Sequence, residues 1–173
     1  MAAMTLPDGP RVRLRPRATG DLGALAAILA EPSVRCWWGE TRPGDLDPPD
    51  DGDLLVVDVA GTVAGLIQYT EVDDPQYRSA GIDIALGADW QGRGVGREAV
   101  GLLVRHLIEV RGHHRLTIDP AAANQRAIRC YAAVGFAAVG VMRQYERAED
   151  GTWHDGLLMD LLADDWRAAQ IAG

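Results

Sequence analysis

A glycine-rich stretch in the middle of the chain constrains the fold more than any other feature. Residues 81–86 (GIDIAL) are apolar and strand-like, and Gly92, Gly94 and Gly96 follow within a few positions. Apolar residues then recur at helical spacing over 95–110. A glycine loop that opens a helix leaves backbone N–H groups unpaired, and the helix dipole adds positive potential there. This strand–loop–helix unit therefore predicts a site for phosphate groups.

The spacing of these glycines does not match two common phosphate-binding loops. The third glycine of the dinucleotide fingerprint is not in the required place, and the Gly-Lys-Ser/Thr ending of a nucleoside-triphosphate loop is missing. The loop resembles the Gln/Arg-x-x-Gly-x-Gly/Ala loop of the GNAT superfamily of N-acetyltransferases, through Gln91, Gly94 and Gly96. In that family the loop holds the pyrophosphate of acetyl-CoA.

A second motif strengthens the resemblance. Residues 124–136 (NQRAIRCYAAVGF) are similar to the "Asn–helix–Tyr–Gly-Phe" signature that follows the fifth strand of GNAT enzymes. A narrower resemblance, to the aminoglycoside 6′-N-acetyltransferases, is patchy before residue 80 and nearly continuous over 81–162. It includes Trp37-Trp38-Gly39, Asp119-Pro120 and residues 153–156 (WHDG). Those relatives usually have a second helix after the tryptophans, where this chain has a short Pro/Asp-rich loop at 40–53.

The order of elements predicts one α/β domain. Strand patterns at 11–15, 54–59, 63–69, 81–86, 115–120, 139–142 and 156–162 alternate with helical patterns after residues 19, 94 and 124. Residues 33–40 are interpreted as a connecting segment. We expect a single N-acetyltransferase domain over 1–173 with the GNAT fold, a mixed central sheet of about six to seven strands flanked by helices, and loose ends at 1–9 and 164–173.

Composition narrows the partners. The 173 residues carry a formal net charge of −8, which argues against nucleic acid and weakly favours a cationic ligand. No apolar stretch is long enough to span a bilayer and no signal peptide is recognisable, so we expect a cytoplasmic protein without a membrane partner. No cluster of metal ligands surrounds His113-His114, so no metal site is expected. A monomer and a homodimer both remain open.

The family resemblance implies the residues that hold acetyl-CoA, the expected co-substrate. Backbone N–H groups of the 83–86 strand would hold the thioester carbonyl and its oxyanion, and the pantetheine arm would lie beside that strand. The predicted cofactor-binding residues are Ile84, Ala85, Leu86, Gln91, Gly92, Arg93, Gly94, Val95, Gly96, Arg97 and Asn124.

The resemblance also implies the catalytic groups. An alkyl amine is mostly ammonium at neutral pH, so acetyl transfer needs a base. Asp119 is the candidate base, with Asp83 gripping the same ammonium, and the alternative for Asp119 is an ordinary turn residue before proline. Tyr131 is the candidate acid for the departing thiolate, and its alternative is a core tyrosine.

Carboxylates and aromatic rings are the groups expected to bind the acceptor, since charge-assisted hydrogen bonds suit a polyamine sugar. The predicted substrate-binding residues are Trp37, Trp38, Glu40, Gln68, Asp83, Asp119 and Asp155. We therefore expect acetyl transfer to the 6′-amine of an aminoglycoside, with antibiotic resistance as its consequence.

Two other functions remain open. A GNAT enzyme of the same chemistry could act on another amine, such as a siderophore precursor, a protein N-terminus or a polyamine, because fold does not choose among acceptors. A non-catalytic binder could sense acetyl-CoA or sequester a cationic drug, although the intact glycine loop and Tyr131 argue against it.

Overall fold

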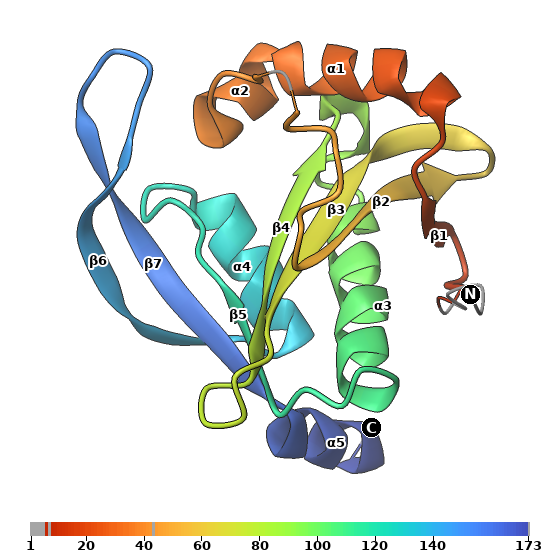
Figure 1. Cartoon of the computed structure of the whole chain (residues 1–173), viewed down its shortest axis with the longest axis vertical. Helices are drawn as coiled ribbons and strands as arrows, with labels where there is room; N and C mark the ends of the chain where they lie inside the picture. Colours follow the sequence, from red (N-terminus) through yellow and green to blue (C-terminus); the bar gives the residue numbers. More distant parts are fainter. Residues whose placement is uncertain (1–5, 7, 43, 173) are drawn as a thin grey trace.

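The computed structural model describes residues 6, 8–42 and 44–172, which form a mixed α/β fold on one seven-stranded sheet (Figure 1). The order of strands across the sheet is β1-β2-β3-β4-β5-β7-β6, and β4–β5 is its parallel pair. The strands are β1 (Val12–Pro16), β2 (Gly52–Val59), β3 (Thr62–Val72), β4 (Ser79–Leu86), β5 (Arg115–Ile118), β6 (Ala137–Arg147) and β7 (Trp153–Leu162). The predicted fold class, with six to seven strands, is confirmed.

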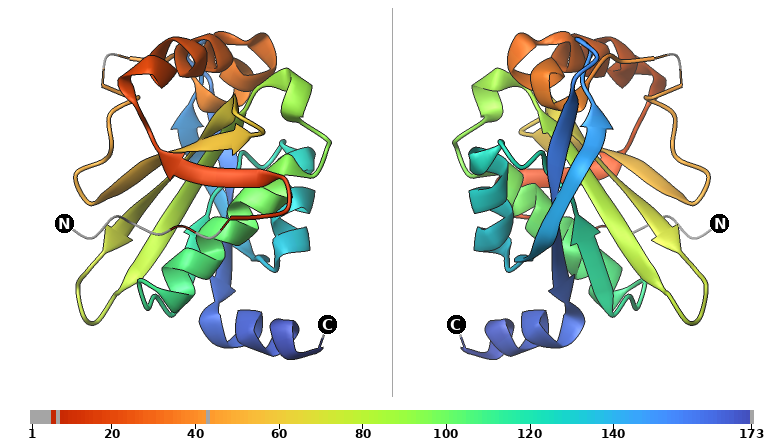
Figure 2. Two further views of the ribbon diagram at one scale, coloured as in Figure 1. Left: turned by 90° about the vertical axis from the view of Figure 1, so that its right-hand side faces the viewer. Right: turned by 90° about the vertical axis from the view of Figure 1, so that its left-hand side faces the viewer.

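Helices cover both faces of the sheet (Figure 2). The α-helices of the described residues are α1 (Leu22–Ala30), α2 (Pro32–Trp38), α3 (Val95–Glu109), α4 (Gln125–Val134) and α5 (Ala163–Ala172). Leu55 and Val57 of β2 pack in the core on the side of α3, whereas Leu54 and Val56 pack with α1. This strand is buried on both faces, which explains its continuous apolar sequence. None of the described helices is long and apolar enough to cross a membrane.

The two central strands β4 and β5 run side by side over a short distance and then separate (Figure 1). Their register joins Ala80 to Leu116 and Gly81 to Thr117. Beyond these pairs β4 continues to Leu86, while β5 ends at Ile118 and the chain turns away at Asp119-Pro120. From Ile82 onward, the edge of β4 that faces β5 has no strand partner among the described residues. The divergence opens the sheet at its middle.

Two segments differ from the sequence-based expectation. Residues 32–38 form α2 rather than a connection, with Pro32 in the first turn, where its missing N–H costs nothing. The C-terminal residues are not a loose end, because α5 covers Ala163–Ala172 and buries Trp166. Within the expected loose N-terminus, residues 1–5 and 7 lie outside the described residues, and Asp8 bridges to Arg13.

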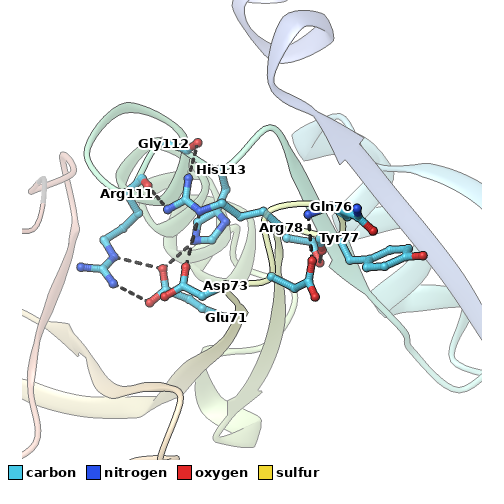
Figure 3. A network of polar contacts seen from close by, with 10 residues as sticks. Glu71, Asp73, Gln76, Tyr77, Arg78, Arg111, Gly112 and His113 are labelled. Carbon is cyan, nitrogen blue, oxygen red and sulfur yellow. Dashed lines mark hydrogen bonds and ion pairs between the residues drawn. The ribbon is translucent and has the colours of Figure 1, made fainter.

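A polar network ties the end of α3 to the end of β3 (Figure 3). The Glu71 carboxylate accepts hydrogen bonds of 3.0 and 2.6 Å from Arg111 and pairs with the buried ring of His113 at 2.6 Å. Burial alone would raise the pKa of Glu71, but its bonds to Arg111 and His113 outweigh that effect and lower it. Arg78 adds two bonds to the carbonyls of Arg111 and Gly112. The network fixes the turn after α3, and none of these residues lines the cavity described below.

Candidate active site

A cavity of about 1080 Å³ occupies the opening between β4 and β5. Its walls come from α2, the loop at 44–50, β3 and β4, the glycine loop, α4 and the end of β6. The volume is at the upper end of the range for small-molecule sites. Residues far apart in the sequence therefore meet where β4 and β5 separate.

The end of the cavity next to the glycine loop is suited to phosphate groups. Gly92 and Gly94 have φ angles of 71° and 80°, in the left-handed region that favours glycine. Gly94 is the N-cap of α3, whose first-turn N–H groups face the loop. Gly92, Gly94, Gly96 and Arg97 line the cavity here. This end of the cavity thus combines backbone N–H donors with an arginine, the groups that the predicted anion site requires.

The loop owes its shape to side chains from elsewhere. Nε2 of Gln91 donates a hydrogen bond of 2.7 Å to the carbonyl of Leu86, which ties the loop to the end of β4. Arg11 donates to the carbonyl of Arg93 at 2.9 Å and pairs with Glu98. Arg93 and the buried Val95 do not line the cavity, although both were predicted to bind the cofactor.

The start of α4 completes this end of the cavity. Oδ1 of Asn124 accepts a bond of 3.2 Å from the N–H of Ala127, so Asn124 caps the helix as well as lining the cavity. Arg126 and Arg129, which sequence reasoning did not select, also line it. With Arg97 they place three guanidinium groups around the glycine loop and α4. The unpaired edge of β4, the left-handed glycines and these cations fit a nucleotide-bearing thioester such as acetyl-CoA.

Two carboxylates face the divergence of the strands from opposite sides. Asp83 lies on β4, and Asp119 follows the last residue of β5. Desolvation raises the pKa of Asp83, and the charge of Asp119 raises it further. Gln68 on β3 donates a bond of 3.4 Å to Asp83. Asp83 and Asp119 thus line the same cavity, close enough for the charge of one to act on the other.

Tyr145 is a site residue that the sequence did not reveal. A hydrogen bond to Asp119, followed by burial, raises the pKa of Tyr145 to about 12. Both Tyr145 and its neighbour Glu146 line the cavity. The sequence-based strand stopped at residue 142, but β6 continues to Arg147 opposite Trp153. A hairpin centred on the Asp150-Gly151 turn pairs residues at equal distances on either side, and this pattern predicts that the first strand includes Tyr145 and Glu146.

Asp155 serves the site indirectly. It was predicted to bind substrate, yet it does not line the main cavity, and neither does Glu40. Oδ1 of Asp155 accepts a bond of 2.8 Å from the N–H of Gln144, whose φ of 51° is left-handed. This kink directs β6 so that Tyr145 packs on Gly156, where an added Cβ would approach the Tyr145 ring to 2.9 Å. Asp155 thus shapes the wall that carries Tyr145.

Tyr131 lies on α4 and is buried, with 8% of its surface exposed. Desolvation is the main cause that raises its pKa above the ordinary value for a phenol, and the charges of Asp83 and Asp119 contribute. Its hydroxyl therefore stays protonated at neutral pH and is available as a donor at the cavity wall. This arrangement agrees with the predicted acid.

The opposite end of the cavity is acidic and aromatic. Trp37 and Trp38 of α2 form part of its wall, as predicted. Carboxylates come from the 44–50 loop and from the strands around the divergence, namely Asp45, Asp47, Asp50, Asp83, Asp119 and Glu146. The acids and the arginines belong to different elements. Such a charge distribution suits an anionic ligand at α3 and α4 and a cationic ligand at the sheet opening.

Comparison with known proteins agrees with this geometry. The family model described as "Acetyltransferase (GNAT) family" matches residues 24–136. Two proteins of Escherichia coli strain K12 are similar in sequence. The [ribosomal protein uS5]-alanine N-acetyltransferase is 26% identical over 104 residues, 60% of this chain and 53% of that protein. Spermidine N(1)-acetyltransferase is 24% identical over 173 residues, 94% of this chain and 92% of that protein. The chain thus matches about half the length of the first relative.

Solved structures share the fold. Spermidine N-acetyltransferase from Vibrio cholerae, in complex with CoA and spermine, superposes with a TM-score of 0.78 at 20% identity, over 92% of this chain and 99% of that chain. Aminoglycoside acetyltransferase AAC(6′)-Ib, in complex with coenzyme A, superposes with a TM-score of 0.73 at 24% identity, over 92% and 99% of the two chains.

Proposed function

The chain belongs to the GNAT acetyltransferase family, and from this premise we propose that it transfers an acetyl group from acetyl-CoA to a primary amine of a polycationic small molecule. The first acceptor that we propose is an aminoglycoside, acetylated on its 6′-amine. The observation that carries the proposal is the pair Asp83 and Asp119 at the divergence of β4 and β5, in a cavity with four further carboxylates.

A protonated amine is bound and deprotonated at the acidic, aromatic end of the cavity, which we call the acceptor end. Asp83 and Asp119 both attract an ammonium group, and two carboxylates on one cation give strong, directional hydrogen bonds. Asp119 is the proposed base, because it lies at the end of β5 beside the unpaired edge of β4. Tyr145, bonded to Asp119, holds that carboxylate in place. The remaining carboxylates bind the other amines of the acceptor.

The acetyl donor is held at the end of the cavity next to the glycine loop and α4, which we call the cofactor end. When bound, acetyl-CoA supplies the acetyl group. The left-handed glycines and the start of α3 offer N–H donors to its phosphates, and Arg97, Arg126 and Arg129 add cationic groups. The free edge of β4 can pair with an extended arm as a strand would. The protonated hydroxyl of Tyr131 is the proposed proton donor for the leaving sulfur.

The aminoglycoside is favoured over a linear polyamine by the tryptophan wall. Trp37 and Trp38 supply an aromatic surface suited to stacking against a sugar ring, and the loop at 44–50 adds carboxylates at a distance from the reacting pair. A polyamine is the second candidate, because the match to spermidine N(1)-acetyltransferase extends over 94% of the chain. Incubation with acetyl-CoA and a panel of aminoglycosides, polyamines and peptides, followed by mass spectrometry, tests the proposal. An acetyl group added to an aminoglycoside supports it, and acetylation confined to a peptide N-terminus refutes it.

A further inference from the structure

One ion pair joins two walls of the acceptor end that are distant in sequence. Nε of Arg35 donates to Oε1 of Glu149 at 2.6 Å, and a second guanidinium nitrogen donates to Oε2 at 2.9 Å. Arg35 belongs to α2, and Glu149 lies in the turn between β6 and β7. The two parallel bonds form the bidentate geometry that gives arginine–carboxylate pairs their directionality. We call this pair the clasp.

Each side of the clasp carries a wall of the cavity. From α2, Ser33, Val34, Trp37 and Trp38 line it, and from β6, Tyr145 and Glu146 line it. Arg35 itself does not line the cavity, so its side chain reaches past the wall to the hairpin. The ion pair therefore closes the perimeter of the acceptor end between the tryptophans and Tyr145.

The two walls are anchored unequally, which makes the hairpin the part able to move. Val34 of α2 is buried and packs in the core with α1 and β4. The β6–β7 hairpin extends beyond the rest of the sheet (Figures 1 and 2). Toward the turn, its last backbone links to the rest of the fold are those of residues 155–157 to residues 120–122, in the loop between β5 and α4. Nearer the turn, the bonds of Ala148, Gly151 and Thr152 stay within the hairpin. A two-stranded ribbon of this kind has little stability of its own.

We propose that the clasp determines which acceptors enter the cavity, by holding the hairpin turn against α2 so that a linear amine can thread in and a multi-ring amine must first open it. This proposal rests on the proposed function, because it concerns the same acceptor end. Both side chains are nearly half exposed, at 48% and 44%, so the clasp is weak enough to open during turnover. Its effect is thus on acceptor selectivity rather than on the chemistry.

The test uses the full chain and the selectivity ratio, defined as kcat/KM for kanamycin divided by kcat/KM for spermidine. Glu149→Gln should raise this ratio about two- to fivefold, the range expected from losing an exposed ion pair. Arg35→Glu places two carboxylates together and should raise it at least as much. The charge swap Arg35→Glu with Glu149→Arg restores the pair and should return the ratio to the wild-type value. Asp164→Asn, which removes an exposed ion pair to Arg167 on α5, is the matched control.

Hydrogen exchange of the hairpin separates the clasp from the proposed function. Amides of residues 146–153 should exchange faster in Glu149→Gln than in the wild type, and at the wild-type rate in the charge swap. An unchanged ratio in the single variants, or a changed ratio that the swap does not restore, overturns the proposal. If the wild type acetylates neither amine, the proposed function and the selectivity role both fail. If hydrogen exchange of the hairpin is the same in Glu149→Gln as in the wild type, the clasp itself is refuted.

Discussion

Gln68 and Asp83 lie opposite one another in the register of β3 and β4, and Nε2 of Gln68 donates a bond of 3.4 Å to Oδ2 of Asp83. The bond orients the carboxylate in the wall of the cavity. Desolvation and then the neighbouring charge of Asp119 raise the pKa of Asp83, so a cation bound between the two would relieve their repulsion. The pair therefore suits an amine that arrives protonated and leaves neutral.

Replacing the proposed base should slow turnover strongly without affecting the donor site. Asp119→Asn should lower kcat by about 10²–10⁴, the usual contribution of a general base. The dissociation constant of acetyl-CoA, measured by calorimetry, should stay unchanged. Asp165→Asn, at an exposed position of α5, removes the same charge and should retain full activity. A rise in KM with kcat intact would make Asp119 a binding group only.

Replacing Tyr131 and replacing Tyr145 should change different kinetic constants. Tyr131→Phe removes the buried hydroxyl on α4 and should lower kcat about 10²-fold, because the leaving sulfur loses its proton donor. Tyr145→Phe removes the bond to Asp119 and should mainly raise KM for the acceptor. Steady-state kinetics with both substrates varied checks this pattern. Equal kcat values for wild type and Tyr131→Phe would show that water protonates the sulfur instead.

The glycine loop should not tolerate a side chain at Gly94, because the backbone there is left-handed. Gly94 has a φ of 80°, and a Cβ added there would lie 3.0 Å from a nitrogen of Arg11. Gly94→Val should therefore distort the start of α3 and weaken acetyl-CoA binding strongly in calorimetry. Gly101→Ala is the control, since that helical position has open space around it. Retained affinity in Gly94→Val would refute the assignment of the loop.

Acid should weaken one end of the sheet in a defined pH range. The hydrogen bonds from Arg15 are the main cause that lowers the pKa of Asp21 from 3.8 to about 2. A lowered pKa stabilises the fold above the unfolded value, and this contribution disappears as pH falls from about 4 to about 2. Asp21→Asn should cost on the order of 2 kcal/mol in the free energy of unfolding at pH 7. The difference from wild type, followed by urea unfolding, should shrink below pH 4, and a constant difference would contradict this explanation.

The main elements could be predicted because their signals are local. The glycines at 92–96 and the apolar spacing of α3 follow from backbone geometry and burial, and Asn124 caps α4 as expected. Other features depend on contacts distant in sequence. The kink at Gln144 needs the carboxylate of Asp155, and it turns a predicted substrate ligand into a support for Tyr145. The helical state of residues 32–38 depends on packing of Val34 against α1, which a short segment with two tryptophans does not reveal.

The measurement that tests the central claim most directly compares two aminoglycosides that differ at one atom. Kanamycin, with a 6′-amine, and a close analogue with a 6′-hydroxyl are each incubated with the protein and acetyl-CoA, and the position of the acetyl group is mapped by NMR. Both compounds keep most of the same charges for the carboxylates of the cavity. We predict turnover of the amine at the 6′ position, and binding of the analogue without acetylation there. Acetylation of the hydroxyl at a similar rate, or an acetyl group on a ring amine elsewhere, would contradict the 6′ assignment, and no reaction with either compound would contradict the proposed acceptor class.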